Sequence, residues 1–152
     1  MPPERAALRL YVPEEPDAGL CSGTDERLNF QTHAFGFVVS AAATGLLLRD
    51  SWSLGDRPLW GVSLIYGLSL LAVYGFSTLS HGQFPQAWRH RFRTLDQISI
   101  FMLIAASATP FLWKYLPPDR CWGMLGLTWF MALVGVGWKL FVARQRLVPV
   151  WY

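Results

Sequence analysis

The sequence predicts an all-α integral membrane protein, a bundle of four transmembrane helices. Apolar residues make up 53% of the chain and charged residues only 15%, a balance well outside that of soluble domains. Four intervals contain no Asp, Glu, Lys or Arg: residues 28–48, 58–88, 97–113 and 121–138. Each is long enough to cross the hydrocarbon layer, which takes about 20 residues, with a range of roughly 17–25. Lipid is therefore the expected solvent of the chain.

Around these spans the chain divides into three parts. Residues 1–24 are expected to form a flexible cytoplasmic tail, because they are polar and proline-rich and lack the apolar stretch of a signal peptide. The transmembrane domain is expected over residues 25–146, and residues 147–152 form the C-terminal end. The spans are expected at about residues 28–49, 59–81, 95–116 and 121–143. A short basic loop is expected between the second and third spans.

The positions of Lys and Arg predict the orientation, because cytoplasmic loops retain these residues. The side with both termini and the second connection carries Arg5, Arg9, Arg27, Arg89, Arg91, Arg93, Lys139, Arg144 and Arg146. The other side carries only Arg49, Arg57, Lys114 and Arg120. Both termini are therefore expected in the cytoplasm, at the inner membrane if the source is bacterial. The net charge of +3 reflects this asymmetry and indicates no nucleic-acid surface.

Polar side chains enter the first span and close the second. Glu26, Asn29 and His33 are spaced three and four residues apart, so they share one helix face. A polar face at membrane depth is expected to point at protein. Ser77 and His81 are four apart at the end of the second span and stack on one face.

The third span begins at a lone carboxylate, Asp96, and the fourth has no ionisable group before Lys139. With the first and third spans running outward and the second running back, Asp96 is expected level with Ser77 and His81 on the inner side. Neighbouring helix axes about 8–10 Å apart make direct contact feasible.

Small and aromatic residues support the predicted packing. Gly36, Ser40 and Thr44 repeat every four residues, which is typical of closely approaching transmembrane helices. Four of the eight tryptophans fall at the predicted outer ends, where amphipathic rings favour the headgroup region, although tryptophan also packs in helical cores. These are Trp52, Trp60, Trp113 and Trp122. Cys21 and Cys121 are expected at opposite faces and therefore as free thiols.

The inner-side residues allow two interpretations. His, a carboxylate and a hydroxyl suit a divalent-metal site, and zinc tolerates three protein ligands with water in the fourth position. Such a water could hydrolyse an ester or amide. The alternative is that His81 and Asp96 only hydrogen-bond across a helix interface at the headgroup level. His90 and its neighbouring arginines are better explained by solvent or anionic lipid contact.

Several ordered motifs resemble the haemolysin III family, the bacterial branch of the superfamily that includes the progestin and adipoQ receptors and the adiponectin receptors. They are Glu26-x-x-Asn29-x-x-Thr32-His33, Ser77-x-x-x-His81, Leu95-Asp96 and Ala105-x-Ser107-x-Thr109-Pro110-Phe111. The resemblance covers residues 25–111. It implies a helical membrane protein, usually with seven spans, whose N-terminus and zinc site both lie on the cytoplasmic side.

By this resemblance His81 and Asp96 are metal ligands and Ser77 positions the metal-bound water, with Glu26, Asn29 and His33 as a supporting shell. Eukaryotic relatives are linked to ceramide hydrolysis. The family's further His-x-x-x-His pair does not occur in this sequence, whose only histidines are His33, His81 and His90. The chain also stops after four spans. We therefore expect a partial gene product, or a short form that completes its bundle by self-association.

Two functional hypotheses follow. In the first, the chain is a haemolysin-III-like membrane protein with a zinc-dependent hydrolase-type site that is incomplete here. In the second, it is a non-catalytic structural, oligomeric or pore-forming protein whose polar cluster serves as helix–helix contacts. Membrane lipids and a second copy of the chain are the expected partners, and no nucleic acid is expected.

Overall fold

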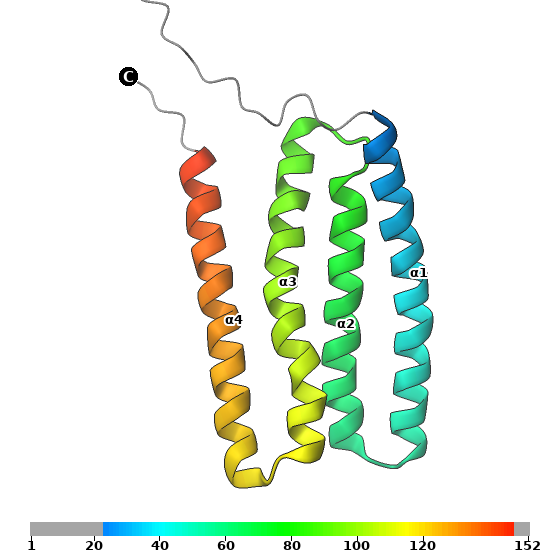
Figure 1. The fold of residues 1–152 in the computed structure, drawn as a ribbon, viewed down its shortest axis with the longest axis vertical. Helices are drawn as coiled ribbons and strands as arrows, with labels where there is room; N and C mark the ends of the chain where they lie inside the picture. The colour runs from blue at the N-terminus through cyan, green and yellow to red at the C-terminus, as the bar shows by residue number, and fades with distance from the viewer. Residues whose placement is uncertain (1–22, 148–152) are drawn as a thin grey trace, which may run out of the picture.

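Four long antiparallel helices make up the described part of the chain (Figure 1). The computed structural model describes residues 23–147, so the predicted tail up to residue 22, with Cys21, and the end from residue 148 lie outside it. The helices are α1 (Gly23–Ser53), α2 (Arg57–Ser80), α3 (Gln86–Tyr115) and α4 (Pro118–Leu147). Each contains a stretch long and apolar enough to span a membrane. The all-α fold class and the four spans are confirmed.

Local chemistry explains the short connections. The Asp56 carboxylate accepts a hydrogen bond from the Leu59 backbone N–H at 2.9 Å and so caps the start of α2. Gly55 just before it has a positive φ of 69°, a conformation that glycine adopts without steric cost. Leu116 and Pro117 separate α3 from α4, and Pro118 is the first residue of α4, because proline fits the first turn of a helix but cannot continue the preceding one. Such short turns force consecutive helices to run antiparallel.

The expected basic loop before the third span is wrong, because residues 86–94 are the first turns of α3. Only residues 81–85 connect α2 to α3. Pro85 sets the entry into the helix, and the Ala and Arg residues that follow favour helix formation. The prediction placed the helix start where the charges end. A helix can begin outside the apolar layer, and here the basic run lies on its first turns.

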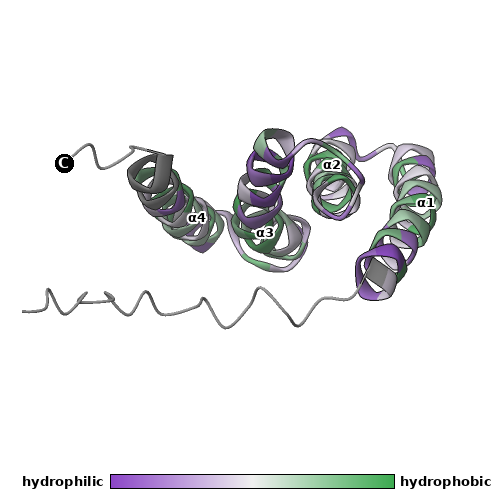
Figure 2. Cartoon of the chain, turned by 90° about the horizontal axis from the view of Figure 1, so that it is seen from above, coloured by the Kyte–Doolittle hydropathy of each residue, from purple (hydrophilic) through white to green (hydrophobic). Residues whose placement is uncertain are grey.

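The helices stand in an open row in chain order. Within the described residues, only α1 with α2, α2 with α3, and α3 with α4 pack backbone against backbone. Figure 2 looks along the helices and shows this row, with polar residues gathered at the near ends of α1 and α3. A row leaves α1 and α4 each with a single neighbour. Contact between α1 and α3 therefore depends on side chains alone.

Small residues fill the interfaces and large apolar residues face outward. The buried apolar residues of the described part are Ala105, Ala106, Cys121 and Ala132. By contrast, side chains as large as Phe35 and Trp138 are about 70% exposed (71% and 70%). In water such a surface would associate. In lipid, where helices are held by close packing of small residues, this arrangement is expected.

The predicted small-residue repeat lies in the α1–α2 interface. Ser40 and Thr44 are buried, and a Cβ at Gly36 would collide with the ring of Tyr74 on α2. A Cβ at Gly67 would likewise collide with Thr44. The helices therefore approach at these positions more closely than larger side chains permit.

Paired tryptophans mark the end of the molecule that carries the α1–α2 and α3–α4 turns. Trp52 and Trp60 meet edge to face with ring centroids 6.1 Å apart, and Trp113 and Trp122 do so at 5.8 Å. This is the end predicted to face outward. Cys121 lies here as a buried free thiol.

Candidate functional site

The polar residues predicted from the sequence gather at the opposite end, where α1 and α3 begin and α2 ends (at the top in Figure 1). Glu26 and His33 come from α1, Ser77 lies on the last turns of α2, and His81 caps it. Asp96 lies on α3. Because the helices are antiparallel, residues far apart in the sequence reach the same level. We call these five residues the inner cluster.

Glu26 joins three parts of the chain through one carboxylate. Its Oε2 lies 2.9 Å from His81 Nδ1 at the end of α2. Its Oε1 accepts a hydrogen bond from Arg89 Nη2 at 3.0 Å and lies 3.5 Å from Arg93 Nη2, both on α3. The Glu26 and His81 side chains are only 24% and 23% exposed. The carboxylate thus connects α1 to α3, which have no direct backbone packing.

The Glu26 contact fixes the orientation and tautomer of His81. A carboxylate can only accept, so His81 Nδ1 carries the hydrogen and donates it. In the neutral ring Nε2 then keeps its lone pair. A carboxylate behind one nitrogen and a free lone pair on the other is how metal-binding histidines are commonly held. The geometry therefore leaves Nε2 available for a proton or a metal ion.

His33 lies flat against His81. Their rings are parallel within 2°, with centroids 5.5 Å apart. His33 also meets the ring of Tyr74 at 6.3 Å. The two imidazoles thus form one side of the inner cluster, with Tyr74 behind His33.

Asp96 completes the cluster from α3. It is partly buried and close enough to His33, His81 and Ser77 for electrostatic interaction. Ser77 itself is buried. Ser77, His81 and Asp96 therefore lie at the same end of the bundle, and their direct contact stays a prediction.

Asn29 and His90 stand apart from this arrangement. The Asn29 side chain makes no hydrogen bond with the described residues, although its backbone carbonyl accepts one from the Thr32 hydroxyl at 3.0 Å. His90 is exposed on α3. The role of Asn29 as part of a supporting shell stays a prediction.

Sequence reasoning missed Arg89 and Arg93 as partners of Glu26. The signal was available, because Arg89, Arg93 and Asp96 are spaced four and three residues apart and so share a helix face. This spacing becomes meaningful only if the predicted third helix also includes the basic residues before Asp96.

Two side chains of the inner cluster carry donor atoms of the kind that zinc accepts. His81 Nε2 and the Asp96 carboxylate have the donor chemistry that zinc uses. No group of three or more His, Cys, Asp or Glu side chains within the described residues is arranged to hold a metal ion. A zinc site with His81 and Asp96 as ligands stays a prediction, and it would need further ligands.

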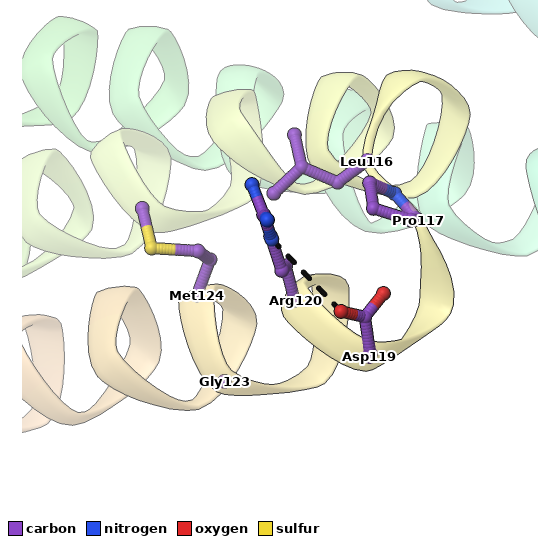
Figure 3. Close-up of a pocket in the computed structure, with 6 residues that line it drawn as sticks. All are labelled: Leu116, Pro117, Asp119, Arg120, Gly123 and Met124. Atoms are coloured by element: carbon purple, nitrogen blue, oxygen red, sulfur yellow. Dashed lines mark ion pairs between the residues drawn. The ribbon is translucent and has the colours of Figure 1, made fainter.

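A hollow lies at the other end of the molecule, at the α3–α4 turn (Figure 3). Its volume is about 460 Å³, and it is lined by Leu116, Pro117, Asp119, Arg120, Gly123 and Met124. Its charged groups are one ion pair, Arg120 Nε to Asp119 Oδ2 at 3.9 Å, in which both side chains are largely exposed. Such a pair contributes little. Size alone does not make this hollow the functional site.

Comparisons with known proteins give consistent results. The model of the family described as haemolysin-III related matches residues 22–152. Hemolysin-3 of Bacillus cereus is 31% identical over 121 residues, which are 80% of this chain and 55% of that protein. The Hemolysin-3 homolog of Bacillus subtilis (strain 168) is 29% identical over 123 residues, 80% of this chain and 57% of that protein. The chain thus spans about half the length of these relatives. No solved structure matches it.

Proposed function

The chain belongs to the haemolysin-III-related family and is a multi-pass membrane protein, and we propose that its inner cluster binds a divalent metal ion, zinc, for hydrolysis of a lipid amide or ester. The observation that supports this most is the 2.9 Å contact between Glu26 and His81 Nδ1. It holds the ring with Nε2 free. We further propose that the cluster faces the cytoplasm.

Each residue of the cluster has a distinct part in this proposal. His81 Nε2 and an Asp96 oxygen would hold the metal, which, when bound, would polarise a carbonyl and make water more acidic. The Ser77 hydroxyl would orient the attacking water. Glu26 would keep the His81 proton on Nδ1, and His33 would hold the His81 ring in place by stacking.

The remaining ligands are the open part of the proposal. A second copy of the chain would bring a second His81 and a second Asp96, and a symmetric dimer would place them together if the ends of α2 face the axis. The relatives are also longer than this chain, and residues of a longer protein could supply the ligands. Both routes leave the roles of His81 and Asp96 unchanged.

One observation favours the non-catalytic alternative. Glu26 already has three partners on two other parts of the chain, which suffices to explain the cluster as a helix–helix connection. In that case the two imidazoles and the carboxylates only hold α1, α2 and α3 together. The same protein in a membrane would then act as a structural or oligomeric component.

Metal analysis of the purified, detergent-solubilised chain separates the two functions. We expect about one zinc per chain or per dimer, measured by plasma mass spectrometry with the oligomeric state determined by light scattering. His81→Ala and Asp96→Ala should each release it. His90→Ala is the matched control, because it removes an imidazole outside the cluster and should keep the metal. Equally low zinc in wild type and all three variants would favour the structural alternative.

A further inference from the structure

A second hollow lies at the start of α3, on the loop side of the inner cluster. It has a volume of about 220 Å³ and is lined by Phe84, Gln86, Arg89, His90 and Arg93. Two of these side chains are guanidinium groups, and none is a carboxylate. We call it the basic hollow. It does not depend on the metal proposal.

The two arginines of the basic hollow share one carboxylate oxygen. Arg89 and Arg93 both contact the same oxygen of Glu26, at 3.0 and 3.5 Å. Glu26 is further shared with His81, and no carboxylate lines the hollow itself. An anion in the basic hollow would give both guanidinium groups a further partner.

The donors of the two arginines are also incompletely used. A guanidinium has five N–H donors in a planar fork, and the contacts to Glu26 use Nη2 of each arginine. Arg89 Nε is buried and has no hydrogen-bond partner among the described residues. A buried donor without a partner is unfavourable, and a small shift of the Arg89 side chain toward an oxyanion would give it an acceptor.

The surroundings specify the class of anion. Arginine forks match the paired oxygens of phosphate, and Arg89 and Arg93 lie one helical turn apart. The hollow adjoins the N-terminus of α3, where the first turn has no acidic residue and the helix dipole favours negative charge. Gln86 and His90 add side chains that can donate hydrogen bonds. We propose that the basic hollow binds a phosphate group, from a phospholipid headgroup or from free phosphate.

The rim is suited to the headgroup layer. Trp88 and Phe84 are 51% and 40% exposed, and the Arg91 guanidinium lies over the Trp88 ring at 5.1 Å. Amphipathic aromatic residues of this kind favour the membrane interface. Arg91 is directed at Trp88 and does not line the basic hollow, so it provides a control of equal charge on the same helix.

Calorimetric titration of the full chain in a phosphate-free, non-ionic detergent tests this. The probes are dioctanoyl phosphatidic acid, sodium phosphate at constant ionic strength, and dioctanoylglycerol, which has the same acyl chains without phosphate. We expect phosphatidic acid to bind at least about tenfold more tightly than dioctanoylglycerol. Arg93→Gln should weaken its binding at least about tenfold, whereas Arg91→Gln should change it less than about twofold.

The three probes also identify the source of the phosphate. Binding of free phosphate that Arg93→Gln abolishes supports phosphate itself as the ligand. Binding of phosphatidic acid alone supports a lipid headgroup. The proposal is overturned if dioctanoylglycerol binds as well as phosphatidic acid, if neither phosphate probe binds, or if Arg91→Gln weakens binding as much as Arg93→Gln.

Checks of folding and of zinc content keep the test independent of folding and of metal. Circular dichroism and gel filtration check both variants, and if Arg93→Gln does not fold, Arg93→Lys against Arg91→Lys makes the same comparison through the lost fork. The zinc content of Arg93→Gln is measured alongside. If the metal proposal fails, the wild type contains little zinc. If the phosphate proposal fails, Arg93→Gln leaves phosphate binding unchanged.

Discussion

Glu26 is central to the geometry of the inner cluster, because its carboxylate contacts both the end of α2 and the start of α3. Its neighbours on α1, Asp25 and Arg27, lie on other faces of the helix. The sequence suggested Glu26 only as one member of a supporting shell, together with Asn29 and His33. The structure gives it a more direct position, bound to His81 itself.

Replacing this carboxylate by an amide should loosen the bundle. We expect Glu26→Gln to lower the free energy of unfolding by about 1–2 kcal/mol, since hydrogen bonds to charged groups contribute about 1.5–3 kcal/mol and partial exposure reduces that value. Unfolding in mixed detergent micelles, followed by circular dichroism, measures it. Asp119→Asn is the control, because its pair with Arg120 is long and exposed. Equal effects of the two changes would contradict the central position of Glu26.

At the level of the helices, the sequence predicted the number of helices well and the residues at which they begin and end less well. Charge-free intervals such as residues 97–113 locate the parts of helices that lie in lipid, since lipid excludes charges. They do not locate helix ends, which depend on caps, turns and prolines. For α3 the difference is the stretch from Gln86 to Thr94, and with it the chance to recognise Arg89 and Arg93 as cluster residues.

Packing between α1 and α2 depends on small residues at defined positions, and α2 offers a matched test. A Cβ at Gly67 would collide with Thr44, whereas a Cβ at Gly61 would meet nothing within 4 Å. Gly67→Ala should therefore destabilise the protein by about 1–3 kcal/mol, as overpacking does. Gly61→Ala should be neutral or stabilising by up to about 1 kcal/mol, because alanine is the better helix former. The same micelle unfolding assay compares them. A stabilising Gly67→Ala would show that α1 and α2 pack less closely.

At the scale of the whole molecule, the described helices form an open row, and the two ends of the bundle along the helix axes differ in chemistry. One end has the inner cluster and the basic hollow, and the other has the paired tryptophans and the apolar hollow at the α3–α4 turn. The sequence could predict this polarity because antiparallel helices of similar length alternate direction. It could not predict the stacking of His33 on His81, nor which oxygen of Glu26 meets which arginine, since these depend on helix rotation and approach.

This polarity makes the membrane orientation testable. Nine of the thirteen Lys and Arg residues fall on the side of the inner cluster by the predicted topology, so that side should be cytoplasmic. In a chain with Cys21 and Cys121 replaced by serine, Ser53→Cys and Gln86→Cys place single thiols at opposite ends of the bundle. A membrane-impermeant maleimide added to intact cells should label Ser53→Cys at once and Gln86→Cys only after permeabilisation. The reverse pattern would put the inner cluster on the outer side and would contradict the proposed cytoplasmic orientation.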